Sequence, residues 1–371
     1  MLLLIILSFT GILYIVINKV YSKHWDKGLN VDIKLSPKEI IEGNNAELIE
    51  VISKESILPL PSVQIKFKTS KYFDFKDHVN SSITDNYYRS DVFSIIGNKK
   101  ITRTLDFMAT KRGYYTVDSI DIIATNIFLS EHYVSNNKKN SSCMYVYPKT
   151  IPQKEINIPL DNIIGDYVAK NSLNEDPFEF KGIRNYQPYD NFSAINWKVS
   201  AKSNTLMVNQ HNSTSSLDAE ILFNADLLNF QSDIFGEMGI RLVATIAEKI
   251  CKFGIPLKFR SNAYDIITNS AISIPASTGP NQLRLINESL SKIDLLAPTD
   301  DFISLLANDN KKESLKIIVS GDYRDSLLNA YSDLKGKNKK VLLIIPTHLN
   351  DKKINIESVN DIFIWEVKDN D

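Results

Sequence analysis

The chain has 371 residues, of which 43 % are hydrophobic and 23 % charged, the ordinary balance of a globular protein with room for two domains. Its 43 Lys and Arg residues against 44 Asp and Glu residues give a net charge of −1, which argues against a nucleic-acid-binding protein. The two cysteines, Cys143 and Cys251, are too few for a disulfide framework, and the five histidines show no zinc-binding spacing.

Residues 1–24 are predicted to be a transmembrane anchor. The stretch MLLLIILSFTGILYIVIN, residues 1–18, has no charged side chain, and as a helix it spans roughly 27 Å, enough for a hydrocarbon core. A cleaved secretory signal is the alternative, but no Lys or Arg precedes the apolar run and no small-residue cleavage site follows it. Because Lys19, Lys23 and Lys27 follow the run, we expect a single-pass protein of the cell membrane with its bulk in the cytoplasm.

Residues 25–150 are predicted to form a β-sandwich domain. Apolar and polar residues alternate in VDIKL (31–35) and VQIKF (63–67), as in strands with one buried face. Turn-rich breaks such as EGNN (42–45) separate these segments, which is typical of an antiparallel sandwich. No motif within this domain indicates chemistry.

Residues 151–175 are predicted to be a linker, because Pro152, Pro159 and Gly165 interrupt any regular element. In residues 176–371, strand-like and helix-like segments alternate, which predicts an α/β domain with a parallel sheet. The strand candidates are continuous apolar runs, as expected for strands covered on both faces: AEILF (219–223), PLKF (256–259), KIIVS (316–320), VLLII (341–345) and IFIWEV (362–367). The chain as a whole is therefore predicted to be an α+β multidomain protein.

Common catalytic motifs do not occur in the chain. It has no phosphate-binding G-x-x-x-x-G-K-[ST], no G-x-G-x-x-G turn and no G-x-S-x-G nucleophile motif. The adjacent carboxylates Asp300 and Asp301 precede the apolar run FISLL, so capping of a helix explains them better than acid–base catalysis.

The carboxyl edge of the predicted sheet is where ligands of such domains normally bind. The stretch ILFNADLLNF looks like the first strand of a von Willebrand factor A-type domain, whose metal site is an Asp-x-Ser-x-Ser run. Asn224, Asp226 and Leu228 stand at those three positions, and Ser320 and Asp322 follow another strand. A hard divalent cation needs more oxygen ligands than this loop supplies, so we expect a degenerate site with no metal and no cofactor.

The densest cluster of charged and aromatic residues is KGIRNYQPYDNFSAINWKVSAK, residues 181–202. This stretch resembles the signature of the bacterial domain-of-unknown-function family 58. The matching positions are Arg184, Tyr186, Pro188, Asp190, Ile195, Trp197, Lys198 and Ala201. The chain departs from the family pattern at Tyr189 and Asn204, where glycine is usual. More weakly, the resemblance extends to the membrane anchor, the β-rich domain and the A-type domain.

The resemblance implies a protein that is not an enzyme. Members of the family are thought to act beside MoxR-type AAA+ ATPases in the assembly or activation of other proteins. The chain is accordingly expected to be a membrane-anchored interaction or scaffold protein, attached through residues 1–18. Its expected partners are a MoxR-type ATPase and other membrane or envelope proteins. The alternatives are a metal-dependent adhesion-type receptor and a cell-envelope scaffold, both built on the A-type domain.

The signature stretch itself allows two interpretations. In the first it is a structural clasp, in which Asp190 caps a short helix that ends at Asn204 and Trp197 is buried. In the second it is a docking surface, in which exposed lysines meet an acidic partner. These lysines are Lys181, Lys198 and Lys202. We expect the clasp, in which Trp197→Ala destabilises the protein and Lys198→Ala and Lys202→Ala are close to neutral, whereas a docking surface requires the lysines for partner binding.

Overall fold

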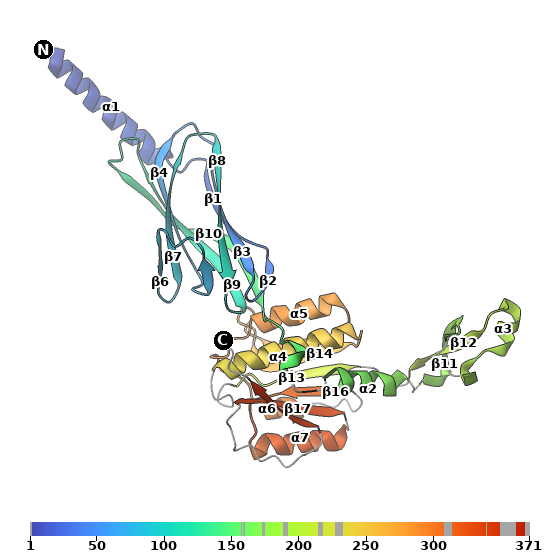
Figure 1. Ribbon diagram of the computed structural model, residues 1–371. Helices are drawn as coiled ribbons and strands as arrows, with labels where there is room; N and C mark the ends of the chain where they lie inside the picture. The colour runs from blue at the N-terminus through green and yellow to red at the C-terminus, as the bar shows by residue number, and fades with distance from the viewer. Residues whose placement is uncertain are drawn as a thin grey trace. The chain divides into compact units, whose positions relative to one another are not determined.

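The computed structural model describes residues 2–156, 158, 160–172, 175–187, 192–213, 218–226, 233–307, 314–338, 340–348 and 361–367. The chain separates into two compact units, Met1–Lys149 and Thr150–Asp371 (Figure 1). Each unit has its own hydrophobic core.

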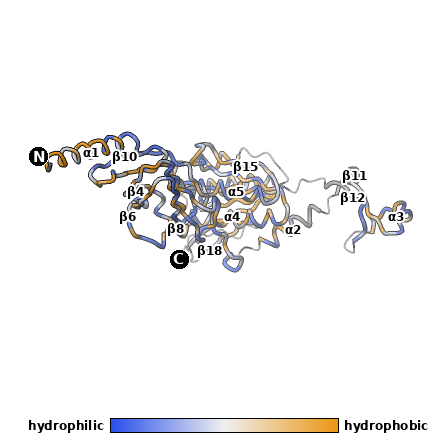
Figure 2. Tube along the Cα trace, turned by 90° about the horizontal axis from the view of Figure 1, so that it is seen from above, coloured by the Kyte–Doolittle hydropathy of each residue, from blue (hydrophilic) through white to orange (hydrophobic). Residues whose placement is uncertain are grey.

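The N-terminal helix α1 (Leu2–His24) has two different halves. Its side chains up to Val16 are mostly apolar and exposed, and this part of the trace is largely orange in Figure 2. Among the described residues, α1 is the one helix long and apolar enough to cross a membrane. Further along, Asn18 and Tyr21 are buried, as is Trp25 directly after the helix, and the two aromatic residues belong to the core of the first unit. The end of α1 therefore packs as part of that unit.

Two sheets make up the rest of the first unit. One has the order β1 (Leu29–Ser36), β3 (Asn45–Lys54), β8 (Lys99–Ala109), β5 (Phe73–Phe75). The other has the order β2 (Glu39–Ile41), β10 (His132–Tyr147), β9 (Gly113–Thr125), β4 (Leu60–Thr69), β7 (Tyr87–Ile95), β6 (Ser81–Ile83). Neighbouring strands are antiparallel except β2, which runs parallel to β10. The predicted β-sandwich is confirmed.

Strand β3 shows how the sandwich core is built. Every second side chain from Ala46 to Lys54 is buried, as the period of a strand requires. The buried positions include Glu50 and Lys54, which are charged residues. Lys54 Nζ donates to the carbonyl oxygens of Trp25 (2.5 Å) and Lys27 (2.9 Å). This lysine therefore ties β3 to the segment that follows α1.

A cluster of charged side chains extends from inside the sandwich, where Arg89 and Asp91 are fully buried, to its surface, where the Asp77 side chain is 43 % exposed. Arg89 Nε donates to Asp91 Oδ2 at 2.5 Å, and Arg89 Nη2 donates to Asp77 Oδ2 at 3.0 Å. Arg103 Nη1 lies 2.8 Å from Asp91 Oδ1. The neighbouring Glu50 is fully buried, and this burial, followed by the charge of Asp91, raises the pKa of Glu50 to about 7. Glu50 therefore gains a proton much more readily than an exposed glutamate does.

The second unit is a mixed sheet with helices on both faces (Figure 1). Its order is β15 (Ala271–Ser277), β14 (Leu257–Tyr264), β13 (Ala219–Phe223), β16 (Leu315–Val319), β17 (Val341–His348), β18 (Ile362–Val367). Strands β14, β13, β16, β17 and β18 pair in parallel in that order, and β15 is antiparallel to β14. One face packs on α2 (Leu160–Ser172), α4 (Asp233–Lys252) and α5 (Pro280–Ser291), and the other on α6 (Phe302–Ala307) and α7 (Asp325–Lys337). The predicted sheet with parallel strands is confirmed.

The prediction that residues 151–175 form a linker is wrong. This segment contains the short helix η1 (Gln153–Glu155) and α2, and the side chains of Leu160, Ile164 and Tyr167 are buried in the core of the second unit. The spacing of these three residues places them on one face of a helix. The segment is therefore part of the α/β unit.

Strand β18, near the end of this unit in sequence, contacts the segment with which the unit begins. Trp365 is buried, and its Nε1 donates to the carbonyl oxygen of Glu155 at 3.1 Å. The bond joins residues 210 positions apart in sequence. Buried indole N–H groups normally need such a partner.

Candidate functional site

The described signature residues lie in an arm, which consists of residues 175–187 and 192–213. Strand β11 (Glu175–Asn185) pairs antiparallel with β12 (Met207–Ser213), with Arg184 opposite Val208. Between them lie the short helix η2 (Phe192–Ala194) and the helix α3 (Trp197–Ser203). Ile195 is buried and forms an isolated bridge with Val208.

Asn196 and Ser200 hold α3 on the ribbon. Asn196 is the N-cap: its Oδ1 accepts from Val199 N at 3.1 Å, while its Nδ2 donates to Asn209 Oδ1 at 2.7 Å. Ser200 Oγ donates to Asn196 O and accepts from Met207 N, each at 2.8 Å. These polar bonds, rather than a large apolar core, orient the helix.

Two predictions about this helix are wrong and one is confirmed. The N-cap is Asn196 and not Asp190, because Asn196 directly precedes the helix and asparagine caps as well as aspartate does. Trp197 is 66 % exposed instead of buried, because Ser200 occupies the side that faces β12. The helix does end at Asn204, which has the left-handed conformation with a φ of 54°.

The other signature positions are only partly described. Tyr186 packs its ring against Phe192 with centroids 5.8 Å apart, and Arg184 Nη1 donates to Asn185 O at 3.1 Å. Pro188, Tyr189 and Asp190 lie outside the described residues, as does the side chain of Lys181. The structure thus brings Arg184, Tyr186, Ile195, Trp197, Lys198 and Lys202 into one arm.

The outward side of α3 is called the α3 face, and it consists of Trp197, Lys198, Ala201 and Lys202. All four are exposed, and they form two pairs at a spacing of four residues, which aligns them along one side of the helix. Nearby on the arm, Phe192 is 69 % exposed. Like charges at this spacing destabilise a helix by roughly 0.2–0.5 kcal/mol. The exposed side chains of this aromatic and basic surface do not contribute to the stability of the fold, and their positive charge is complementary to an acidic partner.

At the carboxyl edge of the sheet, in contrast to the α3 face, the polar side chains are buried and hydrogen-bonded. Asn224, directly after β13, donates from Nδ2 to Ser320 Oγ at 3.0 Å and accepts at Oδ1 from Asn262 Nδ2 at 3.0 Å. Asn262 also donates to Asp300 O at 3.0 Å and accepts from Ala225 N at 2.8 Å. These side-chain amides and the Ser320 hydroxyl are fully buried and bonded to one another. We call this group the carboxyl-edge network.

The guanidinium of Arg324 binds the Asp322 carboxylate of the expected degenerate metal site. Its Nε and Nη2 donate to Asp322 Oδ1 and Oδ2 at 2.9 and 2.8 Å. The hydrogen bond to Asp322, with a smaller effect from the charge of Asp226, raises the pKa of Arg324. Leu228 lies outside the described residues, and within those the structure groups no three His, Cys, Asp or Glu residues as metal ligands.

Sequence reasoning identified Asn224, Ser320 and Asp322 but missed Asn262 and Arg324. Asn262 could have been predicted from the sequence, because it follows the predicted strand 256–259 and therefore reaches the same edge of the sheet. Of the two adjacent carboxylates predicted to cap a helix, Asp301 does so, whereas Asp300 Oδ1 accepts from the Tyr264 hydroxyl at 2.5 Å. Asp301 accepts from the backbone N of Ile303 (3.2 Å) and Ser304 (3.1 Å) at the start of α6, so the predicted helix cap is confirmed.

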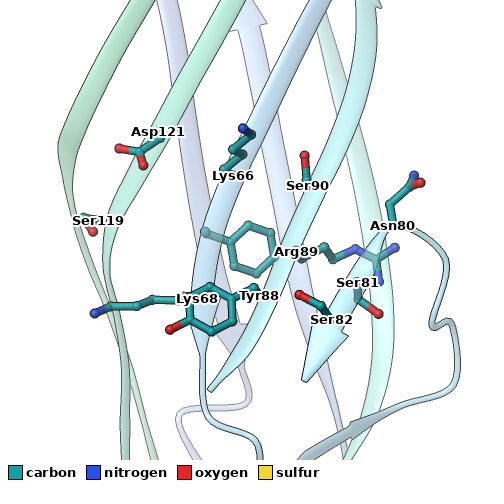
Figure 3. A pocket seen from close by; sticks show the side chains of 11 residues that line it. Lys66, Lys68, Asn80, Ser81, Ser82, Tyr88, Arg89, Ser90, Ser119 and Asp121 are labelled. Carbon is teal, nitrogen blue, oxygen red and sulfur yellow. The ribbon is translucent and has the colours of Figure 1, made fainter. Parts of the chain in front are cut away.

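A groove of about 590 Å³ on the sandwich is a second candidate (Figure 3). Its lining includes Lys66, Lys68, Tyr88, Arg89 and Asp121. Arg89 already belongs to the buried charged cluster, and the lining contains no histidine or cysteine to activate a nucleophile. The α3 face is therefore the stronger candidate for function.

Comparisons with known proteins give little further guidance. No protein-family model matches the sequence, and no curated protein matches it. The CARDB domain of a Pyrococcus furiosus protein is 12 % identical over 33 % of this chain and 90 % of that chain, with a TM-score of 0.22. A non-cellulosomal cohesin from Archaeoglobus fulgidus is 14 % identical over 34 % of this chain and 94 % of that chain, with a TM-score of 0.22. A putative membrane anchored protein from Corynebacterium diphtheriae is 13 % identical over 34 % of this chain and 38 % of that chain, with a TM-score of 0.24.

Proposed function

We propose that the protein is a non-catalytic, membrane-anchored interaction protein whose α3 face binds an acidic surface of a partner. The observation that carries this proposal is the exposure of Trp197 beside Lys198 and Lys202. Tryptophan is enriched among the residues that dominate binding energies, because it buries a large rigid surface. The two lysines add attraction and orientation toward an acidic partner.

Helix α1 holds this surface at the membrane. Its exposed apolar side chains suit a lipid environment, and Lys19, Lys23 and Lys27 follow the apolar run. The positive-inside rule then places both units in the cytoplasm. Protease added to intact, wall-stripped cells should leave the chain uncut, while the same protease should degrade it after lysis. Cleavage in intact cells would reverse the orientation.

The partner we propose is a MoxR-type AAA+ ATPase, acting in the assembly or activation of other proteins. This choice rests on the resemblance of the signature residues to domain-of-unknown-function family 58. The α/β unit is proposed to be a von Willebrand factor A-like domain that acts without a metal. The alternative of a metal-dependent adhesion receptor draws less support, because Arg324 is bound to the Asp322 carboxylate.

The proposal is tested by capture of the purified ATPase on the full chain in lipid nanodiscs, with and without ATP. Trp197→Ala and the double change Lys198→Ala, Lys202→Ala should each abolish capture. The matched control is Lys99→Ala with Lys100→Ala, which removes the same charge from exposed positions on β8. Equal capture by all variants would disprove the role of the α3 face, and no capture by the parent chain would disprove the partner.

A further inference from the structure

A second apolar surface lies in the first unit, at the loop between β9 and β10. Its tip consists of Ile127, Phe128 and Leu129, which are 50 %, 48 % and 60 % exposed. Three consecutive exposed apolar side chains are unfavourable in water and indicate a surface that another medium covers.

The loop is held in a defined shape. Asn126 Oδ1 accepts from Ser130 N at 2.9 Å, Asn126 Nδ2 donates to Ser130 Oγ at 2.8 Å, and Leu129 N donates to Asn126 O at 3.1 Å. Leu129 has a φ of 57°, a left-handed conformation that is uncommon for a bulky residue. The hydrogen bonds of Asn126 thus keep the apolar tip turned outward at a cost in backbone energy.

Polar contacts fix this loop on α1. Asn18 Nδ2 donates to Glu131 Oε1 at 3.0 Å, and Asn126 Nδ2 donates to Asn18 Oδ1 at 2.7 Å. Asn18 is the first polar residue after the apolar run of the helix that ends at Ile17. The loop therefore joins α1 where its apolar surface ends.

From this junction the tip extends along α1 toward its N-terminus. Tyr14 packs on Phe128 with ring centroids 5.3 Å apart, and Tyr14 Oη lies 3.0 Å from Ser130 Oγ. Tyr14 precedes Asn18 by one turn, about 6 Å along the helix axis. Phe128 therefore lies beside the apolar surface of α1, on the N-terminal side of Asn18.

We infer that residues 127–129 insert into the lipid bilayer beside α1 and give the first unit a second membrane contact. The inference rests on the proposed membrane anchor, because the tip and α1 form one continuous apolar surface. Aromatic residues lie behind it, where the lipid headgroups would be: Trp25 stacks on Tyr133 with centroids 6.1 Å apart. A bilayer fits the tip better than a protein does, since α1 beside it already presents an apolar surface for lipid.

The test places a polarity-sensitive fluorophore on single cysteines of the full chain, after Cys143→Ser and Cys251→Ala. The labelled positions are Ile12→Cys in α1, Phe128→Cys at the tip and Val79→Cys as the control. Val79 is exposed and lies near Asp77 and Tyr87, at one end of β7. The other end, at Ile95, pairs with Leu60 of β4, and Val63 of β4 pairs with Ala124 of β9, next to the loop that carries the tip. The length of β7 therefore separates Val79 from the end of the sheet next to the tip by roughly 25 Å, at about 3.3 Å per residue. Each chain is reconstituted into phosphatidylcholine–phosphatidylglycerol vesicles with and without acyl-chain spin labels.

We expect lipid quenching and a blue-shifted emission at Ile12 and Phe128, and neither at Val79. Quenching at Ile12 with Phe128 as unquenched as Val79 would overturn the inference and leave the anchor intact. Absence of quenching at Ile12 would overturn the anchor and the inference together. Emission at Phe128 that is blue-shifted, unquenched by lipid and dependent on protein concentration would assign the tip to a contact between chains instead.

Discussion

The carboxyl-edge network and the α3 face are both polar regions of the second unit, yet their side chains are bonded in opposite ways. In the network, the amides of Asn224 and Asn262 and the hydroxyl of Ser320 are buried and bonded to one another. On the α3 face, Lys198 and Lys202 are exposed, and within the described residues neither forms a hydrogen bond or ion pair. A ligand gains most where folding has left side chains accessible, so the conventional binding edge of the sheet is the less suitable surface here.

The largest effect expected at a polar side chain extends this comparison to Glu50, a buried carboxyl in the first unit. Its pKa of about 7 in the folded chain lies above the ordinary 4.5, so the folded state binds the proton more tightly. Its contribution to stability is therefore present at low pH and is lost as the pH rises through neutrality. The free energy of unfolding of Glu50→Gln relative to the parent should rise by on the order of 3 kcal/mol between about pH 4 and about pH 8.

Urea denaturation of the detergent-solubilised chain, followed by circular dichroism at several pH values, measures this difference. Glu47→Gln is the control, since Glu47 is exposed on the same strand. A difference between Glu50→Gln and parent that stays constant with pH would show that Glu50 does not titrate in this range.

The next largest effect concerns the network itself. Asn262→Ala leaves Ala225 N without its partner inside the protein, while Asn224 Oδ1 keeps the bond from Asp226 N, and one such unpaired buried group costs roughly 1–3 kcal/mol. We expect a loss of about 2 kcal/mol in the free energy of unfolding, from the same denaturation experiment. Asn329→Ala, at an exposed position of α7, should change it by less than about 0.5 kcal/mol. Equal effects of the two changes would show that the carboxyl-edge network does not stabilise the fold.

On the α3 face, Trp197→Ala should alter the free energy of unfolding by less than about 0.5 kcal/mol, because the side chain is exposed. Trp365→Ala removes the same side chain from a buried position and should cost about 3–5 kcal/mol. A large loss for Trp197→Ala would restore the clasp interpretation.

The smallest effect is expected for metals. The melting temperature should not change with millimolar Mg²⁺, Mn²⁺ or a chelator, because Arg324 neutralises Asp322 where a cation would bind. A rise with Mg²⁺ that disappears in Asp226→Ala would show a functioning metal site.

The sequence was most informative where one physical signal dominates. Continuous apolar runs at 219–223 and 341–345 identified buried parallel strands, and Asp301 and Asn204 were recognised as helix caps. The linker prediction failed because Pro159 and Gly165 were weighed above the apolar spacing from Leu160, although proline is compatible with a helix start.

The candidate site was harder to predict. Over a helix as short as α3, apolar periodicity cannot decide which side faces the protein. The deciding contacts are hydrogen bonds of Ser200 and Asn196 to β12, and these depend on the tertiary position of Met207 and Asn209. Arg324 was missed for a similar reason, since its role depends on the carboxylate that it reaches in space.

The bond between Trp365 and Glu155 also has a consequence for synthesis of the protein. Because its partners are 210 positions apart, the second unit has a contact of high sequence separation that forms only after β18 has left the ribosome. Until then β17 presents an unpaired strand edge, while the first unit can already fold. The nascent α/β unit would thus be the part of the chain that most needs protection by a chaperone.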